Sequence, residues 1–196
     1  MNRPQTFSSN LIIAGLDEAG RGSWAGPVSA GAVILPKACK LSGLTDSKLL
    51  SEKKREELFE KIIKIADYGI GFASAAEVDS LGLIKATEIA FIRALEQLKQ
   101  KPEHLLVDGR DKFIFPFTYD SVIKGDQKYR CIAAASVLAK VARDRLMKEN
   151  SNKYPGYAFE SHKGYGTKRH QQALKLQGPS KIHRLSYSPV KVHINQ

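Results

Sequence analysis

Four acidic residues occupy positions from which carboxylate chemistry is possible. Asp17 and Glu18 close a hydrophobic run that predicts a buried strand over Leu11–Asp17, and Asp108 ends a shorter one over His104–Asp108. Asp126 stands where another predicted strand, over 118–124, passes into a long helix. In open α/β sheets, functional side chains gather just beyond the carboxyl ends of the strands. We therefore expect these four side chains to be neighbours in space.

Converging carboxylates need cations. Two carboxylates about 4 Å apart repel each other by roughly 4 kcal/mol at an effective dielectric constant of 20. A ligand set made only of oxygen atoms favours Mg²⁺ or Mn²⁺ over zinc. Paired divalent ions held by carboxylates are suited to phosphodiester cleavage, because one activates water and the other stabilises the leaving oxygen. The pattern predicts a site for two Mg²⁺ or Mn²⁺ ions.

Each acid also has a plainer interpretation. Taken alone, Asp126 is better explained as the N-cap of the helix that follows it. Asp108 with Gly109 could form an ordinary turn, and Glu18 could pair with a surface lysine. Asp17 is harder to explain away, because an acid at the end of a hydrophobic strand lies near the core, where an unpaired charge is costly.

The elements that must position these acids follow from hydrophobic periodicity and capping residues. Ser51 is expected to cap a helix that runs through Ala66, and Thr167 to cap one that Gly178 stops. Further strands are predicted at 26–35, 68–74 and 118–124, and further helices at 83–98 and 129–148. This order predicts an α/β fold in which helices cover both faces of a mixed sheet.

Length and composition set further bounds. The 196 residues fit a single domain, 1–196, whose stretch from about 150 to 196 is expected to be a basic appendage rich in loops and helices. Cys39 and Cys131 lack the spacing of a zinc site. No apolar run is long enough to span a bilayer and no leader pattern opens the chain, so we expect a cytoplasmic monomer without membrane contact.

The net charge of +11 is unevenly distributed. From Met147 onward there are 9 basic and 2 acidic residues, whereas residues 1–146 hold 22 and 18. A basic C-terminal third containing tyrosines favours a polyanionic partner such as nucleic acid. On charge alone, a solvated basic face is an equally good explanation.

Longer motifs add a family resemblance. The stretch Gly15-Leu-Asp-Glu-Ala-Gly-Arg-Gly-Ser-Trp-Ala-Gly-Pro-Val28 closely resembles the signature of ribonuclease HII, the prokaryotic type 2 ribonuclease H. Further matches follow in the family's order and cover nearly the whole chain: Thr45-Asp-Ser-Lys48, Val107-Asp-Gly109, Lys124-Gly-Asp126, Ala133-Ala-Ala-Ser136, Ala139-Lys-Val141, Arg143-Asp144, Gly164-Tyr-Gly-Thr167, Gly178-Pro179 and His183-Arg184. The clearest local departure is Ser23-Trp24.

The resemblance implies a ribonuclease H-like fold and assigns roles to particular residues. The four acids match the family's catalytic, metal-binding carboxylates. Gly20-Arg21-Gly22 matches the loop that reads an RNA-to-DNA junction through the backbone and the 2′-hydroxyl, and Tyr165 matches the tyrosine that packs on the next deoxyribose. The implied substrates are RNA–DNA hybrids and duplex DNA holding single ribonucleotides, cut on the 5′ side to leave 3′-hydroxyl and 5′-phosphate ends.

The other candidate residues have competing interpretations. Without the resemblance, Tyr165 would be a packed loop tyrosine. The lysines at 48, 140 and 168 either contact phosphates or face water, and the sequence does not decide between these roles: Lys48, Lys140, Lys168. The five histidines show no metal-ligand spacing, so we expect surface or structural roles for them.

Two other classes of function compete with the nuclease. A phosphotransferase of the same broad fold group should carry a nucleotide-phosphate loop, and the glycines near Arg21 fit neither G-x-G-x-x-G nor Gly-Lys-Ser/Thr. In a basic nucleic-acid-binding module without catalysis, clustered acids would weaken binding. The carboxylates therefore favour the nuclease.

Overall fold

The computed structural model describes residues 11–39, 41–44, 47 and 50–194. Its five strands form one sheet in the order β3-β2-β1-β4-β5, built from Asp67–Ala73, Val28–Ile34, Ile13–Ala19, His104–Asp108 and Tyr119–Val122 respectively. The pairs β1–β2 and β2–β3 are antiparallel, whereas β1–β4 and β4–β5 are parallel. The sheet is mixed, as the sequence predicts.

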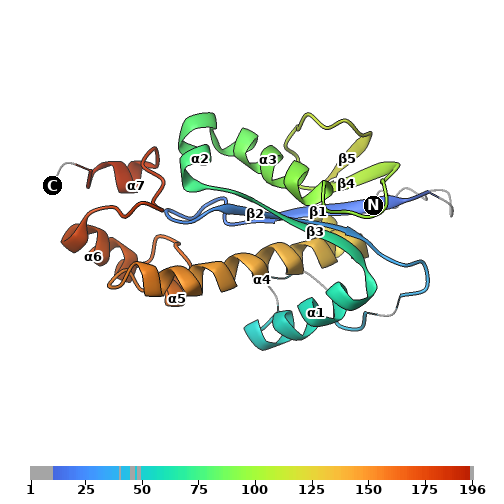
Figure 1. Ribbon diagram of the computed structural model, residues 1–196, viewed down its shortest axis with the longest axis horizontal. Helices are drawn as coiled ribbons and strands as arrows, with labels where there is room; N and C mark the ends of the chain where they lie inside the picture. Colours follow the sequence, from blue (N-terminus) through green and yellow to red (C-terminus); the bar gives the residue numbers. More distant parts are fainter. Residues whose placement is uncertain (1–10, 40, 45–46, 48–49, 195–196) are drawn as a thin grey trace.

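Helices cover both faces of this sheet (Figure 1). On one face α3, Leu83–Leu95, packs against β3 and β2, with the short α2, Ala75–Leu81, beside it. On the other face the long α4, Arg130–Lys153, packs against β1 and β2, with α1, Glu52–Ile65, outside it. The interior strand β2, between β3 and β1, is buried along its whole length, as a strand covered on both faces should be.

Glycines let the helices approach the sheet closely. A Cβ atom at Gly15 would lie 2.3 Å from the backbone carbon of Cys131 in α4, and one at Gly71 would lie 2.0 Å from the carbonyl oxygen of Ala90 in α3. Neither position accepts a larger residue without movement of a helix. The two apolar cores, one under α3 and one under α4, depend on this close packing.

The C-terminal segment adds three short helices: α5, Phe159–His162; α6, Lys168–Gln177; and α7, Ser188–Lys191. It forms its own apolar cluster, which includes Phe159 and Leu174, against Ala25 and Met147 from the main body. Ala25 also forms an isolated bridge with His183. Contacts to Ala25 fix this segment beside the loop that follows β1.

The predicted caps are confirmed: the Ser51 side chain accepts from the Lys54 backbone, and that of Thr167 accepts from His170. The predicted helix over 83–98 is present as α3, which begins at Leu83 and ends at Leu95, whereas the helix α2 before it was not predicted. None of the described helices is long and apolar enough to cross a membrane.

Candidate active site

The sheet register brings two of the predicted acids to one edge. Leu16 in β1 pairs with Val107 in β4, and the strands are parallel, so Asp17 and Asp108 follow side by side. The first strand continues to Ala19, so Glu18 lies within the strand, one residue beyond its predicted end at Asp17. Successive side chains of a strand point to opposite faces. Asp17 therefore shares the face of Gly15, toward α4.

Asp17 is a strongly perturbed carboxyl group. Only 6% of the residue is exposed. Burial raises its pKa well above the usual value, and the charges of Glu18 and Asp108 raise it further. The Ser136 side chain partly opposes this rise, and the Ser136 hydroxyl in turn lies 2.8 Å from that of Ser47. A bound cation would offset both the burial of this carboxylate and its repulsion by Glu18 and Asp108.

Glu18 has an unsatisfied buried oxygen. Its Oε2 atom has no hydrogen-bond partner, while Oε1 lies 3.4 Å from an Arg21 guanidinium nitrogen. Arg21 makes a shorter ion pair, 2.5 Å, with Asp111. Burial raises the pKa of Glu18 in spite of Arg21. An unsatisfied carboxylate oxygen in such surroundings fits a metal ligand whose ion would complete its coordination.

Asp108 and Asp126 are linked through the backbone between them. The backbone N–H of Gly125 donates to Asp108 Oδ1 at 2.6 Å, which places the buried Asp126 one residue from that contact. Asp126 lies in the short 3₁₀ helix Gly125–Gln127, and the N-cap of α4 is Tyr129. The interpretation of Asp126 as the cap of the long helix is therefore wrong.

These acids are neighbours, but they do not form a ready-made cage. Among the described residues, no group of three or more His, Cys, Asp or Glu side chains is arranged to hold a metal ion. Asp17, Glu18 and Asp108 influence one another's charge, so ions would bind by drawing nearby carboxylates together. The set is made of oxygen donors only, which fits Mg²⁺ or Mn²⁺. The four-carboxylate site remains a prediction.

Two buried arginines hold the loop after β1. Arg184 donates to the carbonyl oxygens of Gly20 and Arg21, both at 2.7 Å. Gly20 has φ +89°, and a Cβ there would lie 2.0 Å from Arg143 Nε, so this glycine is required by the structure. A Cβ at Gly22 would meet nothing within 4 Å. The backbone at Gly22 is thus open to a ligand, as the predicted role requires.

Tyr165 lies next to this loop rather than in the core. The residue is 37% exposed, and its ring lies 5.6 Å from Lys140 Nζ and 5.5 Å from the Arg143 guanidinium carbon. A cavity of about 260 Å³ is lined by Glu18, Lys140, Ser47, Ser136 and the whole Gly20-Arg21-Gly22 stretch. The structure thus gathers one acid, the predicted junction loop and one predicted lysine around a single hollow.

The predicted lysines have different surroundings. Lys140 lines the cavity and pairs with Asp144 at 2.8 Å, so its charge is partly neutralised. Lys168 is exposed in the first turn of α6. Lys48 lies outside the described residues.

Ser23 and Trp24 have clear structural roles. The buried Ser23 hydroxyl donates to the Gly20 carbonyl at 3.0 Å. The Trp24 backbone donates to the Gly164 carbonyl at 2.8 Å, and its ring lies so close to Gly166 that a Cβ there would be 2.2 Å from it. This pair therefore joins the loop after β1 to the segment that carries Tyr165.

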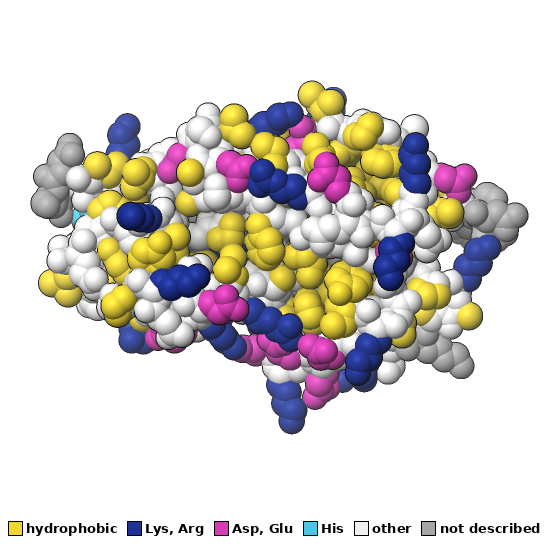
Figure 2. Space-filling model, in the orientation of Figure 1, with side chains coloured by type: hydrophobic (Ala, Val, Ile, Leu, Met, Phe, Trp, Pro, Cys, Tyr) yellow, Lys and Arg dark blue, Asp and Glu magenta, His cyan; other side chains and the backbone are white. Residues whose placement is uncertain are grey.

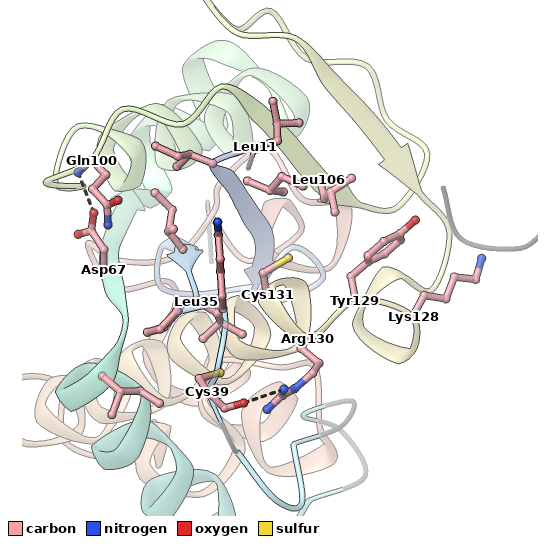
Figure 3. Close-up of a pocket in the computed structure, with 16 residues that line it drawn as sticks. Leu11, Leu35, Cys39, Asp67, Gln100, Leu106, Lys128, Tyr129, Arg130 and Cys131 are labelled. Carbon is pink, nitrogen blue, oxygen red and sulfur yellow. Dashed lines mark hydrogen bonds between the residues drawn. The ribbon is translucent and has the colours of Figure 1, made fainter. Parts of the chain in front are cut away.

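A second cavity, of about 570 Å³, lies where β1 begins and contains none of the predicted site residues (Figure 3). Leu11, Leu35 and Leu106 make it largely apolar, and Cys39 and Cys131 reach into it. Burial raises the pKa of Cys131 to about 11, so this thiol stays protonated. This cavity shares no residue with the carboxylate edge, the end of the sheet that carries Asp17 and Asp108.

Charged side chains are interleaved over the face shown in Figure 2, with acids between the lysines and arginines. Part of this pattern comes from pairs between α1 and α4: Arg145 contacts Glu56 and Glu60, and Lys148 contacts Glu52. Such pairs remove basic charge from α4. Lys168 and Arg169 on α6 are exposed, which leaves them accessible to an anion.

The fold and this carboxylate edge define a class, the metal-dependent nucleases with a ribonuclease H-like fold. The sequence model of the family described as Ribonuclease HII matches residues 14–190. The chain belongs to the ribonuclease HII family, and it is accordingly a metal-dependent endoribonuclease that acts on the RNA of RNA–DNA hybrids.

Individual relatives agree with this assignment. The chain is 51% identical over 185 residues to a ribonuclease HII of Thermus thermophilus, covering 94% of this chain and 90% of that protein. It is 50% identical over 182 residues to a ribonuclease HII of Bacillus licheniformis, covering 92% and 71%. The crystal structure of ribonuclease H2 from Pyrococcus horikoshii superposes with a TM-score of 0.77 at 28% identity, over 93% of this chain and 96% of that one.

The fold extends to more distant proteins. A structure titled as Bst-RNase HIII in complex with Mn²⁺ matches with a TM-score of 0.69 at 15% identity, over 94% of this chain and 69% of that one. That likeness supports the ribonuclease H-like fold, which is thereby confirmed.

Sequence reasoning missed several residues that organise the site. Arg143 and Arg184 were recognised only as parts of motifs, Ser136 likewise, and the histidines were left without partners. The His183-Arg184 motif was the only sequence signal for Arg184, and it does not reveal the partner, Gly20, which lies 164 residues away in the chain.

Proposed function

We propose that this enzyme, acting as a single domain over 1–196 and as a monomer, also cuts duplex DNA on the 5′ side of a single embedded ribonucleotide. The observation that carries the proposal is the shared cavity, in which Glu18 faces the Gly20-Arg21-Gly22 loop. A carboxylate beside a loop with an open backbone at Gly22 supports recognition of the nucleotide whose phosphodiester is cut.

The carboxylates Asp17, Glu18, Asp108 and Asp126 are proposed to bind two Mg²⁺ or Mn²⁺ ions. When bound, such ions activate water and stabilise charge on the phosphate and leaving oxygens. The raised pKa values of Asp17 and Glu18 support this role, because each gains from a nearby positive charge.

The loop and Tyr165 are proposed to supply selectivity. The 2′-hydroxyl is the group that distinguishes RNA from DNA at a given site, and the exposed backbone at Gly22 has polar groups that can contact it. The Tyr165 ring would then pack on the following deoxyribose, where a 2′-hydroxyl would be crowded. Lys140, Lys168 and the undescribed Lys48 are proposed to contact phosphates, which position the duplex without reading its sequence.

One experiment tests the proposal. The enzyme is incubated with Mg²⁺ or Mn²⁺ and three duplexes: uniform RNA–DNA hybrid, DNA with one ribonucleotide, and DNA alone. We expect cleavage of the first two, with 3′-hydroxyl and 5′-phosphate ends 5′ of the ribonucleotide. Cyclic 2′,3′-phosphate ends would contradict attack by water, and an uncut single-ribonucleotide duplex would contradict the junction assignment.

The matched pair Tyr165→Ala and Tyr165→Phe then separates ring packing from the hydroxyl. The alanine variant should lose much of the preference for the single ribonucleotide, since base stacking on an aromatic ring is worth about 1–3 kcal/mol. The phenylalanine variant should keep most of it. An alanine variant as selective as the parent would leave Tyr165 as a packed loop residue.

A further inference from the structure

A chain of hydrogen bonds leads from the C-terminal segment to Tyr165. His170 Nδ1 lies 3.0 Å from the Tyr165 carbonyl oxygen, and His170 Nε2 lies 2.9 Å from His183 Nε2. His183 Nδ1 accepts from the Ser180 backbone N–H at 2.8 Å. Both rings are buried, with 0% of His170 and 2% of His183 exposed.

Only one placement of protons satisfies all these contacts. A carbonyl oxygen accepts only, so His170 must carry its proton on Nδ1. Its Nε2 is then an acceptor, and His183 must donate from Nε2. That leaves His183 Nδ1 free to accept from Ser180, as observed. The chain is therefore directional, with Ser180 donating to His183, His183 to His170, and His170 to the Tyr165 carbonyl.

A third histidine holds the residue before Tyr165. The His162 ring stacks on that of His170 with centroids 4.5 Å apart and planes 13° apart. Its Nδ1 accepts from the Gly164 N–H at 3.1 Å, and its Nε2 contacts the Tyr157 carbonyl at 2.7 Å. The Tyr165 N–H itself donates to the His162 carbonyl at 2.9 Å. The backbone of Tyr165 is thus held on both sides by histidines.

The alternative roles for these histidines do not fit. Each nitrogen of His170 and His183 is already occupied by a hydrogen bond, which leaves no lone pair for a metal ion. Burial lowers the pKa of His170 to about 4 and that of His183 to about 3, so both rings are neutral near neutral pH. Neither ring can then serve as a cationic phosphate contact.

We propose that His170 and His183 are positioning residues that set the Tyr165 ring for junction recognition, and so determine selectivity for a single ribonucleotide. The inference rests on the proposed role of Tyr165. Arg143 and Lys140 lie beside the Tyr165 ring but leave part of it open to solvent, since 37% of the residue is exposed. A shift of its backbone would move that open side away from the sugar it is proposed to cover.

The protonated nitrogen of each histidine ring can be identified without any substitution. Long-range ¹H–¹⁵N correlation spectra of the ¹⁵N-histidine-labelled protein report which nitrogen of each ring is protonated. We expect the Nδ1–H form for His170 and the Nε2–H form for His183 and His162 near neutral pH. An Nε2–H form of His170 would break the chain and overturn the proposal, whatever the enzyme's activity.

The functional test uses a pair of variants of His170. Asparagine places an amide N–H where Nδ1–H stands, and leucine has no donor. His170→Leu should lower the ratio of single-ribonucleotide cleavage to uniform-hybrid cleavage by about fivefold to tenfold, because the Tyr165 carbonyl loses its partner. His170→Asn should retain most of the ratio. An unchanged ratio in a folded His170→Leu protein overturns the proposal.

The same substitution in a Tyr165→Ala background separates positioning from general damage. With no ring to position, His170→Leu should leave the ratio of that variant unchanged, and a further equal fall would assign His170 a role unrelated to Tyr165. If Tyr165→Ala itself keeps the parent's ratio, the proposed function of Tyr165 has failed. If Tyr165→Ala lowers the ratio of single-ribonucleotide to uniform-hybrid cleavage and His170→Leu does not, only the inference about His170 and His183 has failed.

His183 provides a second pair should His170→Leu not fold. Glutamine can still donate from its terminal amide to His170 Nε2, whereas leucine cannot. The ratio should be near that of the parent in His183→Gln and reduced in His183→Leu. Equal ratios in these two variants would contradict a role for the His183 donor. The lone tryptophan, Trp24, lies 5.5 Å from the His170 ring, so its emission reports whether the packing survives.

Discussion

Acid should destabilise this protein through its buried histidines, and His183 gives the clearest measure. Its pKa is about 3 in the folded protein against 6.5 for a free side chain, mainly because burial disfavours the charged ring, with the neighbouring His170 adding to the effect. Between these values the unfolded chain binds a proton that the folded chain does not. Stability is therefore lost as the pH falls below about 6.5, and the loss stops growing near pH 3.

The size of this effect follows from linkage. At about pH 4.5 the unfolded histidine is almost fully protonated and the folded one almost fully neutral. At this pH, two units below the unfolded pKa, His183 alone lowers the free energy of unfolding by about 2–3 kcal/mol. Asp17 and Glu18 act in the opposite direction, because their pKa values are raised on folding, so the total change in the parent does not isolate the histidine.

The assay is therefore a difference between two proteins. Urea unfolding is measured at about pH 7 and pH 4.5, without divalent ions, for the parent and for His183→Gln, which does not titrate. The carboxylate contributions cancel, so the parent should lose about 2–3 kcal/mol more on acidification than the variant. Equal losses in the two proteins, within about 0.5 kcal/mol, would refute the buried neutral state of His183.

Three further outcomes are expected. Asp17→Asn should abolish cleavage at saturating metal and raise the melting temperature, because it removes a buried charge repelled by its neighbours; near-normal turnover would contradict the carboxylate site. Replacing Lys168 and Arg169 by alanine should flatten the salt dependence of duplex binding by roughly 0.9 per lost phosphate contact in log Kd against log salt; an unchanged slope would assign them to solubility. Gly20→Ala should destabilise the protein by about 1–3 kcal/mol in thermal unfolding, because its φ is +89° and Arg143 occupies the space, whereas Gly22→Ala should leave stability unchanged.

Elements with local signals were predictable from the sequence. The strand His104–Asp108 has the predicted bounds, and Ser51 and Thr167 cap the predicted helices. The helix α2 was missed although Ser74 and Glu77 form a capping box, a signal that was present in the sequence. The alternative interpretation of Asp126 as the cap of the long helix failed because a 3₁₀ turn intervenes before α4 begins.

The sequence by itself determined which acids and which loop could do chemistry, because strand ends, glycines and their motif spacing are local properties of the chain. Only the tertiary structure decided how these residues are held. Arg184 binds the Gly20 carbonyl from 164 residues away, and the His183–His170 pair fixes Tyr165 through protons whose places depend on every partner in the chain. Hydrogen-bond partners of buried polar groups are chosen by packing, and packing brings together residues that no sequence period connects.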